Sequence, residues 1–241
     1  MELSSAALAI NSLFAGYDKV FLTVLHWLET ILGPVLTPIM KLITLLGEKG
    51  LLMFLLAFVL MCFSKTRKTG LCLFGAVCCG ALITNIILKD AIARPRPFET
   101  VDLYKQWWIA VGSPAEDGFS FPSGHMTACA AGMTALTLMR GKKLLVPSII
   151  IVFLMGVSRN YLMAHYPSDV LMGTIVGCFS GFAAWFIANL IYRFLESHDN
   201  VSLFAFVLDF DLPISLPEKF SLPSKLSLPS RPGRYKGKHE K

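Results

Sequence analysis

Long runs of apolar residues without any charge recur along the first 195 residues of the chain. Five such runs contain no Asp, Glu, Lys or Arg, and they cover residues 50–64, 69–88, 126–139, 144–158 and 170–192. An α-helix needs about 20 apolar residues to cross the hydrocarbon core of a bilayer. Two runs reach that length alone, and the other three approach it with flanking uncharged residues. The pattern therefore predicts five membrane-spanning helices.

A sixth apolar stretch, at about residues 20–46, is less regular. It contains three ionisable residues and two prolines, which are His26, Glu29, Lys41, Pro34 and Pro38. Proline inside a helix removes a backbone hydrogen bond and bends or breaks the helix. We therefore expect a bent or split first span, and in total an all-α, polytopic membrane protein with six transmembrane helices.

Short loops rich in Lys and Arg mark the cytoplasmic side of a membrane protein. Such loops follow the second, fourth and sixth predicted spans, where the basic residues are Lys65, Arg67, Lys68, Arg140, Lys142, Lys143 and Arg193. With six spans, these loops lie on one side together with both termini. Residues 89–123 and 159–168 then lie on the outer side. We expect a multi-pass protein of the cell (inner or plasma) membrane with cytoplasmic termini.

The C-terminal part differs from the rest and divides the chain into residues 1–196, a membrane domain, and residues 197–241, a tail. The tail contains a hexad repeat that begins Ser-Leu-Pro at positions 215, 221 and 227. Proline every six residues prevents a helix, so we expect a flexible, basic, Pro/Ser-rich cytoplasmic segment. Its cations either contact anionic headgroups or only help to fix the topology.

Composition supports a lipid environment. Of the 241 residues, 54% are hydrophobic and 16% are charged, whereas a typical soluble domain is about 25% charged. The formal net charge is +6. Residues 219–241 contain seven basic residues and one acidic residue, which accounts for the whole excess. The basic balance therefore gives no indication of nucleic-acid binding. The six cysteines lie inside predicted spans, and no Cys/His spacing resembles a zinc site.

Three cations gather at the outer end of the third predicted span. Lys89, Arg94 and Arg96 lie there, and Pro95 and Pro97 end the helix around them. The positive-inside bias disfavours this placement, and a bound anion would explain it. The arginine fork matches phosphate oxygens, and lysine adds a point charge. The alternative is that these side chains extend to the headgroups.

The sequence Phe-Pro-Ser-Gly-His opens the fourth predicted span. Ser123 can cap the helix, and the free N–H groups of a first helical turn form an anion site. Gly124 allows an oxygen to approach the backbone, and His125 beside it is a group that titrates near neutrality. The alternative is an ordinary capped helix with a histidine at the membrane interface.

A third cluster connects the fifth and sixth predicted spans. Arg159 interrupts the outer end of the fifth span, His165 lies in the connection, and Pro167 suits the first turn of the sixth helix. Asp169 follows His165 by four residues, so its carboxylate can accept a hydrogen bond from one ring nitrogen. The other nitrogen is then free as a nucleophile. The alternative is a structural His–Asp pair that joins two helices.

The basic loops, which contain none of these residues, place all three clusters at the outer membrane face. Together they supply cations, helix-end N–H groups and two histidines. Phosphoryl transfer requires positive charge on the phosphate oxygens and groups in line with the attacking and leaving atoms. The clusters therefore predict a phosphoryl-transfer site at the outer face, and its cations can neutralise the phosphate without a metal.

The clusters resemble the three-part signature of the type 2 phosphatidic acid phosphatase superfamily of membrane lipid phosphatases. That signature reads K-x6-R-P, P-S-G-H and S-R-x5-H-x3-D, and it is complete here in the same order. The resemblance covers about residues 20–195. It implies that His165 is the nucleophile and forms a phosphohistidine, that Asp169 orients it, and that His125 is the general acid. The implied phosphate-binding residues are Lys89, Arg96, Ser123, Gly124 and Arg159. It implies no cofactor and no metal.

The resemblance leaves the lipid substrate open, because the motifs contact phosphate and not the lipid. A compact six-span member looks like a bacterial undecaprenyl-diphosphate phosphatase. Similar members act on phosphatidylglycerophosphate, diacylglycerol diphosphate, phosphatidic acid or lipid A phosphates. Phosphate transfer to another lipid is a second enzyme hypothesis. A small transporter or lipid-binding protein is the non-enzymatic one, and it would carry ionisable residues near mid-span. The expected partners are the lipid substrate and the bilayer, and the oligomeric state cannot be read from the sequence.

Overall fold

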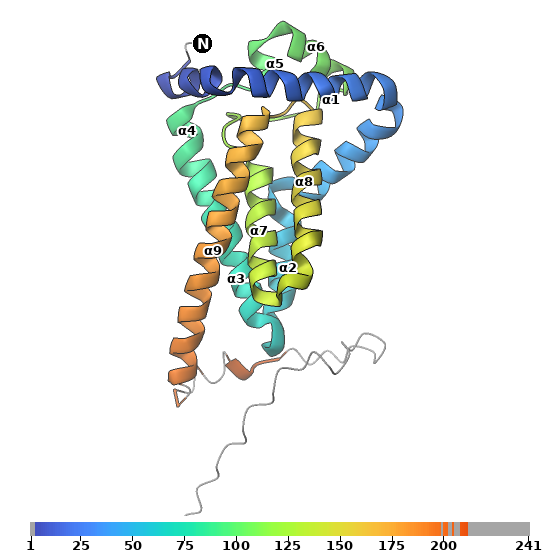
Figure 1. Ribbon diagram of the computed structural model, residues 1–241. Coiled ribbons are helices and arrows are strands. Elements are labelled where there is room, and N and C mark those ends of the chain that lie inside the picture. Colours follow the sequence, from blue (N-terminus) through green and yellow to red (C-terminus); the bar gives the residue numbers. More distant parts are fainter. Residues whose placement is uncertain (1–2, 199, 202–203, 205–207, 212–241) are drawn as a thin grey trace, which may run out of the picture. The chain divides into compact units, whose positions relative to one another are not determined.

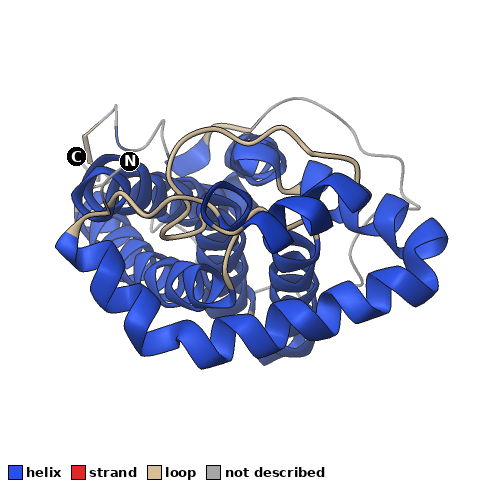
Figure 2. Cartoon of the chain, turned by 90° about the horizontal axis from the view of Figure 1, so that it is seen from above, coloured by secondary structure: helices blue, strands red, loops and turns tan. Residues whose placement is uncertain are grey.

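The computed structural model describes residues 3–198, 200–201, 204 and 208–211. Over these residues the chain forms helices and loops without a strand (Figure 2), which confirms the all-helical prediction. They belong to one compact unit that ends at Asp211, whose carboxylate accepts a hydrogen bond of 2.7 Å from the Ser64 hydroxyl. The hexad repeat of the tail lies outside the described residues.

Five long helices and several short ones make up this unit (Figure 1). The helices, including the π- and 3-10 segments named η, are α1 (Ser5–Leu46), η1 (Glu48–Gly50), α2 (Leu51–Met61), α3 (Ser64–Ala81), η2 (Leu82–Leu88), α4 (Lys89–Ile92), α5 (Pro97–Thr100), α6 (Asp102–Ala110), α7 (Gly124–Arg140), η3 (Lys142–Leu144), α8 (Leu145–Tyr161) and α9 (Pro167–Ser197). Four helical segments are long and apolar enough to cross a membrane, namely Ser5–Leu46, Ser64–Thr100, Lys142–Tyr161 and Pro167–Ser197. The chain is therefore a multi-pass membrane protein.

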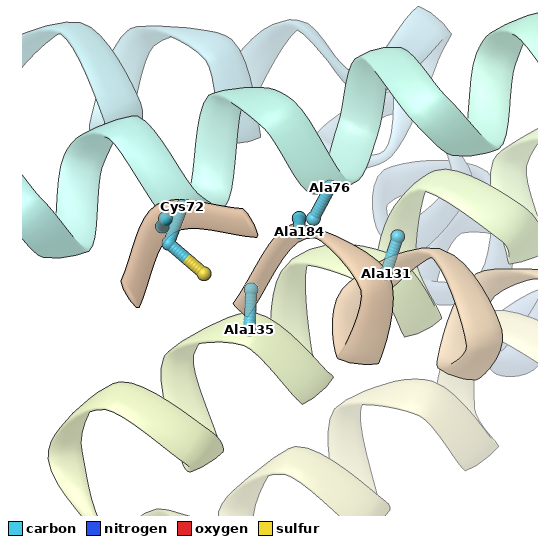
Figure 3. Close-up of a cluster of buried hydrophobic side chains, with 6 residues drawn as sticks. Cys72, Ala76, Ala131, Ala135 and Ala184 are labelled. Atoms are coloured by element: carbon cyan, nitrogen blue, oxygen red, sulfur yellow. The ribbon is translucent and has the colours of Figure 1, made fainter. Parts of the chain in front are cut away.

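Glycines let α7 and α9 pack closely at the centre of the bundle. A Cβ atom on Gly173 would lie 2.7 Å from the Ser123 carbonyl oxygen, and one on Gly177 would lie 2.6 Å from the Thr127 carbonyl oxygen. These distances are shorter than carbon and oxygen tolerate, so the two backbones reach this separation only without side chains. Figure 3 shows the adjoining cluster of small side chains from α3, α7 and α9, which includes Cys72, Ala76, Ala131, Ala135 and Ala184.

The C-terminal end of the third predicted span is a π-helix, η2. The wider π turn is rare and frequent at functional sites. Thr84 lies inside it, is fully buried, and donates a hydrogen bond of 3.0 Å to the Thr127 hydroxyl on α7. This contact fastens the segment to α7. The helix then ends at Ile92, as the prolines predict, and residues 93–96 are not helical.

The first helix, α1, does not follow the path of the predicted first span. It is one helix that continues through Pro34 and Pro38 and bends without breaking (Figure 1). Its first part lies across one end of the bundle, and its last part descends toward α2 (Figure 1). The Ser4 hydroxyl at its start donates to the Ile92 carbonyl at the end of α4. The prediction placed the chain's start at the opposite end, and polar contacts that the sequence does not reveal hold it here.

The basic loops lie at the other end of the bundle. The start of α3, the turn from α7 to α8 and the end of α9 are all there (Figure 1). The N-terminal end of α7, the C-terminal end of α8 and the N-terminal end of α9 meet at the end that α1 covers. These helix ends carry the second and third predicted clusters, and α4, which carries the first, lies near the same end (Figure 1). The fold thus separates the clusters from the basic loops along the bundle axis.

Candidate active site

A cavity of about 430 Å³ brings most of the predicted site residues together. One end of it is polar and is lined by five of them, which are Lys89, Arg96, Gly124, His125 and His165. The other end is apolar and is lined by Phe54, Val77, Ala81 and Ala128 from α2, α3 and α7. The other three predicted residues lie next to this lining. Arg159 contacts Glu116, Asp169 lies 3.7 Å from His165, and the Ser123 N–H donates to the Asp169 carbonyl. The cavity therefore suits a molecule with an anionic end and an apolar end.

Two arginines hold a carboxylate at the polar end. Glu116 lies between them, with one oxygen 3.0 Å from Arg96 Nη1 and the other in a short contact with Arg159 Nη2. Both guanidinium groups are almost completely buried. Buried cations need an anionic partner, and here a glutamate from the α6–α7 loop supplies it. The two arginines thus form a site for an anion, and in this structure the Glu116 carboxylate occupies it.

Arg96 and Arg159 differ in how many of their N–H donors have a hydrogen-bond partner. Arg96 donates to three backbone carbonyls, which are those of Asp117, Gly118 and Ala164, at 2.7–3.0 Å. Its role includes holding the loop beside His165. Arg159 donates to Glu116 through Nη2 alone, and its Nε and Nη1 find no hydrogen-bond partner among the described residues. Buried donors without partners are costly, and a bound phosphate would satisfy them.

Ser123 stands at the N-cap position of α7 but does not cap it. Its side chain makes no hydrogen bond to the first turn, and its buried Oγ has no partner within the described part of the chain. The expectation of a side-chain cap is therefore wrong. The Ser123 carbonyl accepts from the Thr127 N–H at 2.9 Å, as at any helix start, and the Ser123 N–H donates to the Asp169 carbonyl at 3.1 Å. The hydroxyl remains available as another donor.

His165 is buried, and one of its ring nitrogens is committed. Its Nδ1 lies 2.8 Å from the Ser120 carbonyl oxygen, whereas the nearer oxygen of Asp169 is 3.7 Å away. A carbonyl can only accept, so Nδ1 carries the proton and Nε2 keeps its lone pair. Burial, reinforced by the positive charges of Arg96 and Arg159, lowers the pKa of His165 well below 6.5. The imidazole is therefore neutral and competent as a nucleophile.

Asp169 lies behind His165 in a network that sequence reasoning missed. One carboxylate oxygen accepts from the Tyr166 N–H at 2.8 Å, and the other accepts from Arg94 Nη1. Arg94 is fully buried and also donates to Asp18 of α1 at 2.9 Å. Asp18 in turn accepts from the Ser168 N–H and hydroxyl at 2.8 and 2.7 Å. Arg94, the cation of the first cluster that the K-x6-R-P motif does not include, therefore has a positioning role. It connects α1 to the start of α9.

His125 has an acidic partner of its own. Its Nε2 lies 3.2 Å from a carboxylate oxygen of Glu48, which belongs to the segment between α1 and α2. A carboxylate oxygen only accepts hydrogen bonds, so this contact requires a proton on Nε2 of His125.

The residues that the sequence did not single out share one property, which is that their partners are distant in the chain. They are Asp18, Glu48, Glu116 and Ser120. Asp18 alone carried a local signal, because an acidic residue inside an apolar helix marks a functional or structural contact. Among the described residues, no three His, Cys, Asp or Glu side chains converge in a way that could hold a metal ion.

The fold and this site define a class of protein: a helical membrane protein with a cavity at one end of its bundle that is lined by cations and two histidines. The comparison with protein families agrees with that class. Residues 69–193 match the model of the PAP2 superfamily, and the chain belongs to this superfamily. This is the family that the three-part signature resembles.

Named relatives and a solved structure support the assignment. The chain is 30% identical to the undecaprenyl-diphosphatase BcrC of Bacillus subtilis over 67% of this chain and 80% of that protein. It is also 30% identical to an undecaprenyl-diphosphatase of Sulfolobus acidocaldarius, over 52% of this chain and only 57% of that relative's length. The crystal structure of a PAP2-type phosphatidylglycerolphosphate phosphatase from Bacillus subtilis matches with a TM-score of 0.61 and 26% identity, over 78% of this chain and 93% of that one.

Proposed function

We propose that this protein hydrolyses the phosphate or diphosphate group of a membrane lipid through a phosphohistidine intermediate. The observation that carries the proposal is the cavity that joins His125, His165, Lys89 and Arg96 to an apolar end. A soluble phosphate ester would have no use for that apolar end.

In this proposal the phosphate displaces Glu116 from between Arg96 and Arg159, and it accepts hydrogen bonds from the unpartnered donors of Arg159 and Ser123. Lys89 and the free N–H groups at the start of α7, beside Gly124, add to the positive potential.

The chemistry is then divided between the two histidines. His165 Nε2 attacks phosphorus, and the bond from phosphorus to the lipid oxygen breaks as His125 protonates that oxygen. Water next attacks the phosphohistidine, with His125 accepting its proton, and phosphate leaves. The Ser120 carbonyl holds the attacking tautomer, and Asp169 stabilises the ring electrostatically from 3.7 Å.

For the substrate we propose undecaprenyl diphosphate, converted to undecaprenyl phosphate. Two of the relatives carry the name undecaprenyl-diphosphatase, and the better covered of them spans two thirds of this chain. Relatives named phosphatidylglycerophosphatase B and lipid A phosphatase keep those lipids as alternatives. Phosphatidic acid, diacylglycerol diphosphate and transfer to an acceptor lipid are further outcomes of the same test. We place the protein in the cell (inner or plasma) membrane with the site facing outward, since the basic loops lie at the other end of the bundle.

The test is a rate panel with purified protein in detergent, with a chelator present. We expect phosphate release to be fastest from undecaprenyl diphosphate and unaffected by the chelator. The variants His165→Ala and His125→Ala should lose activity by at least about 100-fold, whereas His198→Ala, at an exposed histidine beyond the end of α9, should retain it. Full activity in His165→Ala would exclude the mechanism. An acceptor-dependent lipid product in place of free phosphate would show transfer.

A further inference from the structure

The first part of α1 stays at the active-site end of the bundle over a long distance. Ser4 contacts Ile92 at the end of α4, Asp18 accepts from the Ser168 N–H at the start of α9, and the Thr37 hydroxyl lies 2.8 Å from that of Tyr161 at the end of α8. A helix from Ser4 to Thr37 is roughly 50 Å long at 1.5 Å per residue. A membrane-crossing helix of this length would have its two ends at opposite ends of the bundle. This segment therefore lies across the bundle and does not cross with it.

Three different faces run along this segment. The face toward the protein carries the buried residues Ala7, Asp18, Leu22 and Leu25. A second face carries exposed apolar side chains at positions seven and four residues apart, which are Leu13, Val20, Val24 and Ile31, with exposed fractions of 51–76%. A third face carries exposed polar side chains at equivalent spacings, which are Ser12, Lys19, Thr23 and Thr30. Because a helix turns by about 100° per residue, these sets occupy three separate sectors.

The apolar face of α1 is directed toward the side of the bundle that meets lipid. Tyr17 and Phe21, which lie on α1 between its apolar face and its buried face, line an apolar groove of about 600 Å³ together with residues of α7, α8 and α9. Below them the groove is lined by exposed apolar residues such as Phe153 and Phe182. The apolar face of α1 is thus continuous with the apolar outside of the bundle, while its polar face points away from it.

The last part of α1 and the short α2 together make one crossing. Thr37 contacts Tyr161 at the end of α8, Thr44 contacts Ser158 about one turn further in, and Gly47 lies beside Met155 another turn in. At the far end, a Cβ on Gly70 of α3 would meet the Met61 backbone at the end of α2 at 2.6 Å. The 11 residues of α2 are too few to cross a bilayer alone. Together with residues 34–46 they provide the required length.

We propose that residues 5–33 lie in the plane of the membrane surface on the active-site side, with their apolar face in the lipid of that leaflet. A helix with one apolar face and one polar face adopts this position at a bilayer surface. The described bundle then crosses the membrane five times, and the start of the chain is on the same side as the active site. The sequence predicted six spans and two cytoplasmic termini. The proposed topology has five spans and moves only the N-terminus to the active-site side, and the basic loops stay on the side opposite the site.

The topology is tested by labelling with a membrane-impermeant maleimide in intact and in permeabilised cells. Three exposed positions are converted to cysteine one at a time: Ser12→Cys on α1, Lys105→Cys on α6 at the active-site end, and Lys143→Cys at the opposite end. We expect Ser12→Cys to follow Lys105→Cys, and Lys143→Cys to show the opposite dependence on permeabilisation. Labelling of Ser12→Cys in parallel with Lys143→Cys would overturn the proposal. The unsubstituted protein reports the background from the six native cysteines, and the result does not depend on the substrate or the mechanism.

The contact with lipid is tested by neighbouring spin labels in vesicles of phosphatidylethanolamine and phosphatidylglycerol. Val24→Cys lies on the apolar face and Thr23→Cys on the polar face of the same turn, so they form a matched pair. We expect the label at position 24 to collide with oxygen more than with a water-soluble nickel complex, and the label at position 23 to show the reverse. Equal access of the nickel complex to both labels would exclude the position in the membrane surface.

Discussion

At the scale of single residues, the site depends on which atoms keep a partner and which do not. His165 uses Nδ1 for the Ser120 carbonyl, so its other nitrogen is free, and Arg159 keeps two donors without a partner among the described residues. The motif spacing predicted that these residues meet. It did not predict that a backbone carbonyl, rather than Asp169, holds the ring of His165, because Ser120 is 45 residues away in the chain.

The lowered pKa of His165 has a measurable consequence for catalysis. The ring is neutral in the folded protein well below pH 6.5, because burial and two arginines disfavour its cation. We expect formation of the phosphoenzyme, measured by rapid quench, to show no loss from His165 protonation between pH 7 and pH 6. A fall in the rate of phosphoenzyme formation with a midpoint near pH 6.5, without a matching change in substrate binding, would contradict the neutral state of His165.

The same shift affects stability. The unfolded chain binds a proton at this histidine below about pH 6.5 and the folded protein does not, so the free energy of unfolding falls as the pH drops below that value. The contribution is up to about 1.4 kcal/mol per pH unit. We expect the variant His165→Gln to lose less thermal stability than the parent between pH 7 and pH 5. Equal losses in the two proteins would show that this histidine titrates alike in both states.

At the scale of elements, the packing of α7 on α9 determines the distance between the two catalytic motifs. His125 opens α7 and Asp169 lies in the first turn of α9. The glycines of α9 let the α7 backbone approach it, and this approach brings the Ser123 N–H to the Asp169 carbonyl. The apolar runs predicted the helices themselves. The closeness of this pair depends on glycines that look unremarkable within an apolar run.

A pair of glycine substitutions tests this packing. A Cβ on Gly177 would lie 2.6 Å from a backbone oxygen of α7, whereas a Cβ on Gly75 would meet only the Ala184 Cβ at 3.7 Å. Both changes to alanine raise helix propensity equally. We expect Gly177→Ala to lose about 1–3 kcal/mol of stability together with activity, and Gly75→Ala to be neutral or slightly stabilised in thermal unfolding. Equal thermal midpoints in the two variants would show that α7 and α9 tolerate a wider separation.

At the scale of the whole molecule, three distant parts of the chain meet behind His165, the proposed nucleophile. Asp18 of α1, Arg94 between α4 and α5, and the start of α9 form one buried network. The network fastens α1 to the bundle end and holds the carboxylate that faces His165. Arg94 also stacks on Tyr166, with its guanidinium carbon 3.9 Å from the ring centre.

Removal of Asp18 tests this connection. The variant Asp18→Ala leaves Arg94 and Ser168 without their shared acceptor, and breaking one side of a buried ion pair costs about 3–5 kcal/mol. We expect a lower thermal midpoint and a lower kcat, with Asp18→Asn intermediate because its side-chain oxygen can still accept. The matched control is Lys19→Gln, the exposed neighbour on the polar face. A parent-like midpoint and kcat in Asp18→Ala would rule out the positioning role.

The sequence by itself determined the class of environment, the helices and the chemistry. Apolar runs long enough to cross a bilayer leave few other folds, because every backbone polar group must be paired within the lipid. The motif residues carry their chemistry wherever the fold places them. The tertiary structure alone decided the path of α1, the roles of Asp18, Glu48 and Glu116, and the closeness of α7 and α9. Apolar periodicity reports that a helix faces lipid, but a helix that crosses a membrane and one that lies on it can share the same composition. The path of α1 over the end of the bundle follows from contacts between distant residues, such as Asp18 with Arg94, which composition does not reveal.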